Sequence, residues 1–169
     1  MKNILTLNAI SPVINDVFDS TYNVASDVNA PIGIMLRSFK MHDYKLDENT
    51  IAIARAGAGT NNIPVSEYAE QGVVVFNTPG ANANAVKELV LASLLIGSRN
   101  LMNATDWVKT LKGQGDEVGK LVEKGKSNFA GKEIYRKKLG VIGLGAIGAL
   151  VANIGLSMGM EVYGYDPYL

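Results

Sequence analysis

Three glycines near the end of the chain have the spacing G-x-G-x-x-G: Gly143, Gly145 and Gly148. The flanking residues predict a strand at 139–142, a helix at 149–158 and a second strand at 161–165. In such a unit the first glycine permits a tight turn, the second lets the backbone approach a pyrophosphate, and the third lets the helix lie close to the strand. The segment therefore predicts a dinucleotide site, with a glycine-rich packing turn that binds no ligand as the alternative.

The second of these strands ends at an acidic residue, Asp166, about 20 residues beyond the first glycine. A carboxylate at this position accepts hydrogen bonds from a ribose diol, and its charge repels a 2′-phosphate. The pyrophosphate itself would bind to N–H groups at the positive end of the helix. We therefore expect NAD, rather than NADP, as the cofactor.

The composition excludes several classes of function. Sixteen basic and sixteen acidic side chains cancel, so no long-range field favours nucleic acid or a membrane surface. The chain has no cysteine, which excludes disulfides, thiolate metal sites and a cysteine nucleophile and is typical of a cytoplasmic protein. Its single histidine, His42, excludes a multi-histidine metal cluster and lies among polar residues typical of a surface turn. We therefore expect no metal, and no catalytic role for His42.

The first half of the chain alternates apolar strands with helices. We predict strands at 2–7, 32–36, 51–54 and 73–76, and helices at 11–18 and 64–71. Strands that are apolar throughout are typical of a parallel sheet that is buried on both faces. The predicted fold class is α/β, with a flavodoxin-like parallel-sheet substrate domain followed by the first βαβ unit of a Rossmann NAD-binding domain.

This pattern predicts three parts, at 1–84, 85–137 and 138–169. Within the second part, residues 85–108 predict one helix that is apolar on nearly every face as far as Ile96 and is buried between layers. Residues 109–138 are rich in glycine and lysine, and we interpret them as an arm that wraps a partner subunit, with a solvated loop as the alternative. Because a dinucleotide domain normally needs a second βαβ half, we expect the third part to be truncated.

Polar groups follow two strands of the predicted sheet. Arg37 comes after one strand and Arg55 after the next, so their guanidinium groups could converge on one phosphate or carboxylate. The backbone N–H groups of residues 57–59 could bind a second anion. The alternatives are two ordinary surface arginines and a tight glycine turn. Asn61 and Asn62 could donate to a substrate or cap the next element.

Taken together, the segments 36–38, 54–62, 76–80, 138–148 and 164–167 resemble the D-isomer-specific 2-hydroxyacid dehydrogenases, in particular members that act on a phosphorylated 2-hydroxy acid. The resemblance implies a substrate site that consists of Arg37, Ser38, Arg55, Ala58, Gly59 and, in a homodimer, Lys126. It implies a cofactor site that consists of Gly143, Gly145, Ala146, Ile147, Gly148 and Asp166.

The catalytic arginine, acidic residue and histidine of that family come from the second half of its nucleotide domain. No such half follows residue 169, so the resemblance implies that the chain by itself has no catalytic set and no turnover. Two alternatives stay open. One is a D-2-hydroxyacid dehydrogenase for lactate, glycerate or formate, which would not require both arginines. The other is an NAD-sensing interaction module similar to the corepressors that resemble this family.

Overall fold

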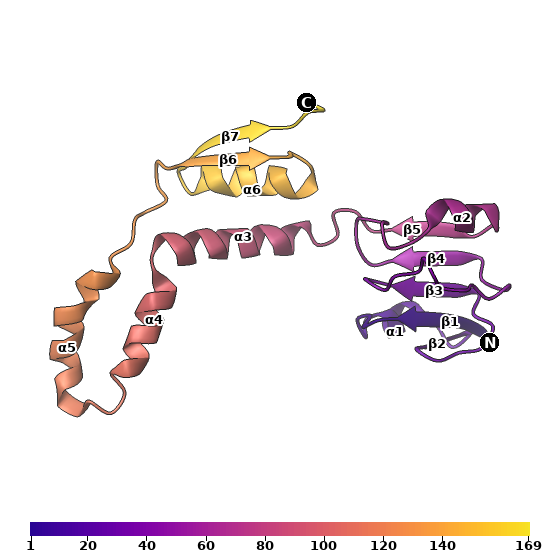
Figure 1. The fold of residues 1–169 in the computed structure, drawn as a ribbon, viewed down its shortest axis with the longest axis horizontal. Coiled ribbons are helices and arrows are strands. Elements are labelled where there is room, and N and C mark those ends of the chain that lie inside the picture. The colour runs from indigo at the N-terminus through magenta and orange to yellow at the C-terminus, as the bar shows by residue number, and fades with distance from the viewer. The chain divides into compact units, whose positions relative to one another are not determined.

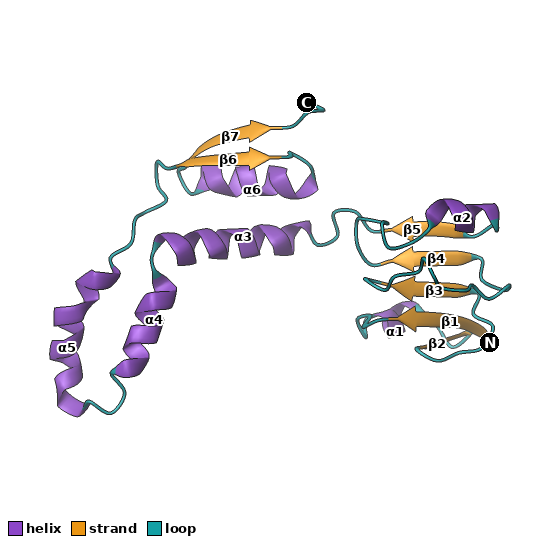
Figure 2. Cartoon of the chain, in the orientation of Figure 1, coloured by secondary structure: helices purple, strands orange, loops and turns teal.

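The computed structural model describes residues 1–169 as two compact units, Met1–Asn82 and Ala83–Leu169 (Figure 1). Both units combine α-helices with parallel strands, and the second unit also has two short 3₁₀ helices (Figure 2). No helix has the length and apolar character that crossing a membrane requires. The division of the sequence into 1–84, 85–137 and 138–169 stays a prediction.

The first unit is built on a parallel sheet of five strands in the order β2-β1-β3-β4-β5, which confirms the predicted fold class. This order is that of a flavodoxin-like sheet. The elements are β1 (Lys2–Leu7), α1 (Ile14–Val17), β2 (Tyr22–Ala25), β3 (Gly33–Leu36), β4 (Ala52–Arg55), α2 (Val65–Glu70) and β5 (Val74–Asn77). The register pairs Leu36 with Arg55 and Arg55 with Asn77, so these three strands end level with one another.

Two local predictions for this unit were wrong. Strand β2 was not expected, because it is a four-residue edge strand that pairs only with β1 and includes the exposed Asn23. Helix α1 covers only Ile14–Val17 of the expected 11–18. The preceding residues form a turn in which the Ile14 N–H donates to the Ser11 carbonyl at 3.1 Å, and Phe18 is already extended.

The core of the first unit lies against β3 and β4. Its fully buried side chains are Ile34, Leu36, Met41 and Ile53. Tyr68 on α2 joins this core, and its hydroxyl donates to the carbonyls of Met41 at 2.8 Å and Tyr44 at 3.1 Å. The loop between β3 and β4 is therefore tied to α2.

The second unit begins with two helices where one was expected. Helix α3 (Ala83–Ser98) and α4 (Leu101–Thr110) are separated at Asn100, which has the left-handed φ of 52° that asparagine tolerates better than most residues. The Lys132 N–H donates to the Ser98 carbonyl at 2.8 Å, so a later segment of the chain docks where α3 ends. Helix α3 packs on one side against α6 (Ala146–Ser157), and Ala83 is its only buried residue. The expected burial of this helix on nearly every face is therefore wrong for this chain.

The segment 109–138 has more regular structure than the sequence indicated. It contains η1 (Gly115–Glu117), α5 (Val118–Gly125) and η2 (Lys126–Phe129). The rings of Trp107 and Phe129 stack at 4.9 Å, and a Cβ atom at Gly125 would overlap the Trp107 ring. These aromatic side chains therefore join α4 to the end of the segment, which makes it a helical hairpin rather than an open loop.

The second unit ends with the strand–helix–strand arrangement that the glycine spacing predicted. Strand β6 (Lys138–Ile142), helix α6 and strand β7 (Glu161–Tyr165) form a βαβ unit in which the two strands are parallel neighbours. A Cβ atom at Gly155 would lie 2.7 Å from Leu139, so α6 approaches β6 closely at this glycine. Figure 1 shows α6 lying along the two strands.

Replacement of Tyr68 by Phe is expected to destabilise the first unit by about 1–3 kcal/mol. Tyr68 is only 4% exposed, and the substitution removes the hydroxyl that donates to the carbonyls of Met41 and Tyr44. Urea denaturation measures this change. Tyr168→Phe is the matched control, since Tyr168 is 92% exposed and should change stability little. Equal effects of the two substitutions would show that the Tyr68 hydroxyl does not anchor the loop.

Candidate functional site

The turn between β6 and α6 depends on two glycines. Gly143 has a φ of +87°, and its N–H donates to the Tyr165 carbonyl at 2.7 Å. A Cβ atom at Gly148 would overlap the Gly143 carbonyl oxygen, which is backbone and has little room to move. These two positions therefore require glycine for the turn and for the approach of the helix.

Gly145 differs from these two, because a Cβ atom there would meet no protein atom within 4 Å. Gly145 is the extended N-cap of α6, and no side chain caps the helix. The N–H groups of the first helical turn, at Ala146, Ile147 and Gly148, consequently have no partner within the helix. Free N–H groups at the positive end of a twelve-residue helix, next to open space, fit an anion such as a pyrophosphate.

Asp166 follows β7 directly and is tied to the glycine turn. Its Oδ1 accepts the Tyr168 N–H at 3.0 Å and its Oδ2 accepts the Leu144 N–H at 2.7 Å. These two bonds, with that from Tyr168 the larger cause, hold the pKa of the Asp166 carboxyl below its ordinary value of 3.8. An ionised carboxylate has further lone pairs, so it can accept a ribose hydroxyl without losing either bond.

In the first unit, Arg55 is hydrogen-bonded to the backbone and Arg37 is not. The Arg55 Nε donates to the Arg37 carbonyl at 3.0 Å, and its Nη1 donates to the Gly59 carbonyl. Arg37 is exposed, and its guanidinium makes no hydrogen bond or ion pair anywhere in the chain. Arg37 is therefore free to bind an anion, whereas Arg55 is engaged in shaping the loop that follows it.

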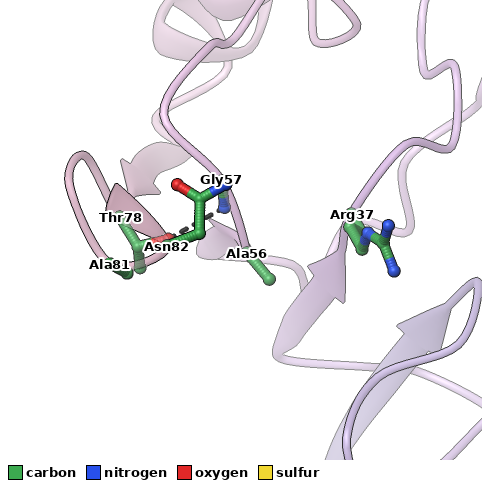
Figure 3. A pocket seen from close by; sticks show the side chains of 6 residues that line it. All are labelled: Arg37, Ala56, Gly57, Thr78, Ala81 and Asn82. Carbon is green, nitrogen blue, oxygen red and sulfur yellow. Dashed lines mark hydrogen bonds between the residues drawn. The ribbon is translucent and has the colours of Figure 1, made fainter. Parts of the chain in front are cut away.

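A pocket of about 340 Å³ lies at the carboxyl ends of β3, β4 and β5 (Figure 3). It is lined by Arg37, Ala56, Gly57, Thr78, Ala81 and Asn82. Thr78 holds one wall, since its Oγ1 accepts the Gly57 N–H at 2.8 Å and its own N–H donates to the Gly57 carbonyl at 3.0 Å. Thr78 was not among the predicted site residues. The signal that could have found it is a hydroxyl directly after a strand that ends level with β4.

The loop after β4 offers backbone donors. The N–H groups of Ala58 and Gly59 donate to no acceptor in the chain. The Ala58 carbonyl accepts the Asn77 side-chain amide at 2.7 Å, which fixes the orientation of this peptide. The loop can therefore present two fixed N–H groups to a carboxylate.

Ser38 and the two asparagines have distinct positions. Ser38 is exposed, its backbone N–H donates to the Asn8 Oδ1 at 3.2 Å, and its hydroxyl makes no hydrogen bond within the chain. Asn62 is 8% exposed and donates to the Phe39 carbonyl at 2.8 Å, so it supports the loop after β3. Asn62 therefore stabilises the loop. Asn61 is exposed, and its side-chain amide donates no hydrogen bond within the chain.

Lys126 and His42 are not part of these clusters. Lys126 belongs to the second unit, where its ammonium pairs with Glu123 at 2.6 Å on an exposed surface. His42 is exposed in the loop between β3 and β4 and makes no side-chain hydrogen bond. No group of three or more histidine, aspartate or glutamate side chains could hold a metal ion.

Comparison with known proteins gives a consistent result. Residues 91–169 match the D-isomer specific 2-hydroxyacid dehydrogenase, NAD binding domain. The D-3-phosphoglycerate dehydrogenase of Methanocaldococcus jannaschii is 39% identical over 122 residues, which are 72% of this chain and 21% of that protein. The hydroxypyruvate reductase of Thermotoga maritima is 40% identical over 120 residues, 71% of this chain and 36% of that protein. The chain thus spans about a fifth to a third of the length of these relatives.

Among solved structures, the NAD⁺-bound 3-phosphoglycerate dehydrogenase of Entamoeba histolytica matches with a TM-score of 0.68 and 24% identity. The match covers 99% of this chain and 55% of that one, and at this identity it shows the fold. The matched family domain is an NAD-binding domain, which agrees with the expected cofactor. That the free N-terminus of α6 and Asp166 hold this cofactor stays a prediction.

Replacement of Gly145 by Ala is expected to leave the fold intact but weaken NAD binding by at least about tenfold, because the new methyl group occupies the space where the pyrophosphate approaches the backbone. Gly148→Ala is expected to destabilise the second unit, since its methyl group overlaps the Gly143 carbonyl. Thermal unfolding and calorimetric NAD titration of both variants separate the two effects. Gly140→Ala is the control, because its Cβ also meets no atom within 4 Å but lies in β6.

Replacement of Asp166 by Asn is expected to lower the free energy of unfolding at neutral pH. The folded state lowers the pKa of Asp166, so the carboxylate stabilises the fold above pH 3.8, and this contribution is lost as the pH falls through the lowered pKa. Wild type and variant should therefore converge in stability at acid pH. Urea titrations at neutral and acid pH measure this, with Asp116→Asn as control, since the Asp116 side chain accepts no hydrogen bond. A difference that is the same at both pH values would refute the role of these two bonds.

Proposed function

Because the NAD-binding domain match and the close relatives place this chain in the D-isomer specific 2-hydroxyacid dehydrogenase family, we propose that it forms the substrate-binding unit and the beginning of the NAD-binding domain of a D-3-phosphoglycerate dehydrogenase. The observation that carries the proposal is the free guanidinium of Arg37 at the same sheet edge as the free N–H groups of Ala58 and Gly59. Two separate donor sets at one edge suit a substrate with two anionic groups.

In this proposal the substrate binds through both ends. The Arg37 guanidinium pairs with the phosphate, and the N–H groups of Ala58 and Gly59 donate to the carboxylate. Arg55 keeps the loop of residues 57–59 in place through its bond to the Gly59 carbonyl. The carbon that bears the hydroxyl group is then held between two fixed anchors, which is the positioning that hydride transfer requires.

The N–H groups of Ala146 and Ile147 would hold the pyrophosphate of NAD⁺, and Asp166 would accept from its adenosine ribose. When bound, NAD⁺ would supply the hydride acceptor for oxidation of 3-phosphoglycerate to 3-phosphohydroxypyruvate, with the hydroxyl proton passing to a base. None of the chain's own residues is assigned to proton transfer, since His42 is exposed and has no partner that would orient it. We expect no turnover from residues 1–169 alone.

In the cell, the enzyme would act as a cytoplasmic homodimer in the first step of serine biosynthesis. The helical hairpin with its stacked Trp107 and Phe129 is the candidate arm toward the partner subunit, and Lys126 at its end is the candidate basic residue for the partner's substrate.

One observation favours a second candidate, a dehydrogenase for a 2-hydroxy acid without phosphate. Arg55 donates from Nε and Nη1 to the carbonyls of Arg37 and Gly59 and does not line the pocket, so Arg37 supplies the one guanidinium there. The 40% identity with a hydroxypyruvate reductase is compatible with this alternative. The two substrates differ in the phosphate group, so binding of each to the same variants distinguishes the candidates.

Replacement of Arg37 by Ala is expected to weaken binding of 3-phosphoglycerate by about tenfold to a hundredfold, because a charge-assisted bond is lost. Binding of D-glycerate, which has the carboxylate but no phosphate, should change by less than about threefold. Isothermal titration of the 169-residue chain with each ligand measures both values. Arg99→Ala is the control, since Arg99 is exposed and its side chain makes no hydrogen bond. Equal losses for both ligands would contradict the assignment of Arg37 to the phosphate.

A further inference from the structure

A second cavity, of about 490 Å³, also borders Arg37. Its walls are mainly apolar and include Ile10, Val13, Ile14, Val17, Phe18 and Met35. It shares Arg37 and Ala56 with the pocket at the strand ends, so one arginine borders both spaces. A volume of this size is in the range of cavities that bind small organic ligands.

The apolar wall of the cavity comes largely from α1 and the residues at its ends. The helix has only four residues, and the chain becomes extended at Phe18. Val13 is 63% exposed and Val17 is 73% exposed, although both border the cavity. Apolar surface that lines a concave space is a feature of ligand-binding sites rather than of ordinary surface.

Arg37 is the only charged residue of the lining and has no partner for its guanidinium. In Figure 3 the guanidinium extends away from Gly57 and Asn82. Asp16, the acidic residue of α1, does not line the cavity. An apolar space with one unpaired cation at its border is complementary to a molecule that has an apolar chain and one negative charge.

We propose that this cavity binds an amphipathic monoanion, with its carboxylate on Arg37 and its alkyl chain against Val13, Val17 and Met35. Since Arg37 also borders the pocket at the strand ends, such a ligand competes with the anionic substrate for the same guanidinium. Binding of the monoanion stands independently of the proposed function, whereas the competition rests on it. The cavity is thus an inhibitory site for medium-chain carboxylates.

Isothermal titration of the 169-residue chain with hexanoate, octanoate and octan-1-ol tests the binding. Octanoate is expected to bind saturably and more tightly than hexanoate, by up to about fourfold for each added methylene group. Arg37→Met should weaken octanoate by about three- to tenfold and leave octan-1-ol unchanged, since the alcohol has no charge for the arginine. Affinity that is independent of chain length, or equal for octanoate and octan-1-ol, would overturn the proposal.

A second substitution tests the apolar wall. Val17→Asp places a carboxylate at the border of the cavity and should reduce octanoate binding by at least about tenfold, because it adds like-charge repulsion and removes apolar contact. Val17 is largely exposed, so the fold should persist, which circular dichroism checks. Val65→Asp is the matched control, since Val65 is an exposed residue of α2 outside the cavity. Unchanged octanoate binding in folded Val17→Asp would overturn the proposal.

The competition and the rival occupants have their own readouts. Octanoate should raise the apparent dissociation constant of 3-phosphoglycerate without changing that of NAD; failure of 3-phosphoglycerate to bind at all, with octanoate binding intact, would overturn the proposed function and leave the cavity's assignment standing. Sedimentation velocity without ligand distinguishes a protein occupant. If Val17→Asp converts a dimer into a monomer, the cavity face is an interface between copies of the chain, and the small-ligand proposal is overturned.

Discussion

The register of the parallel sheet is the constraint on which the first unit depends. Because Leu36 pairs with Arg55 and Arg55 with Asn77, three strands end level, and the loops that follow them leave from one edge. A slip of one residue in β4 would turn Arg55 to the opposite face and move Ile53 out of the core, since side chains alternate along a strand. The burial of Ile34 and Ile53 therefore stabilises the sheet. By holding the register, it also holds Arg37, Thr78 and the loop of residues 57–59 at one edge.

Both candidate anion sites use backbone N–H groups more than side chains. Ala58 and Gly59 present free N–H groups in one unit, and Ala146 and Ile147 present them at the start of α6 in the other. Substitution of a side chain does not change the backbone N–H donors themselves. The small residues around these donors instead determine whether an anion can reach them. The open space at Gly145 and the overlap at Gly148 show the two different reasons why glycine stands in one motif.

Arg37 and Arg55 differ because only Arg55 is hydrogen-bonded to backbone carbonyl groups. Arg55 lies over its own loop, within reach of the Arg37 and Gly59 carbonyls, and becomes a support for the backbone. Arg37 has no acceptor within reach and borders two cavities of different character, one at the strand ends and one against α1. The same residue type therefore serves structure at one position and is available for ligands at the other.

The sequence by itself determined the elements whose signal is local. The apolar strands predicted the parallel sheet, and the glycine spacing predicted the βαβ unit. Together with the acidic residue after β7, the same spacing predicted the NAD cofactor. These predictions succeed because turns and buried strands depend on residues that are close together in the sequence. Weaker signals did not predict two features. The edge strand β2 has one neighbour and an exposed asparagine, and the break between α3 and α4 lies at Asn100, beside the bond from the Lys132 N–H to the Ser98 carbonyl.

Only the tertiary structure decided which polar groups are free. Sequence spacing treated Arg37 and Arg55 as an equivalent pair and left Asn62 undecided, whereas the fold brings Arg55 to two carbonyls and buries Asn62 under the loop after β3. It also brought Thr78 against Gly57 from a strand 21 residues away. The physical reason is that a hydrogen-bonding group is satisfied by whatever the fold places within about 3 Å, and that neighbour is seldom adjacent in the chain.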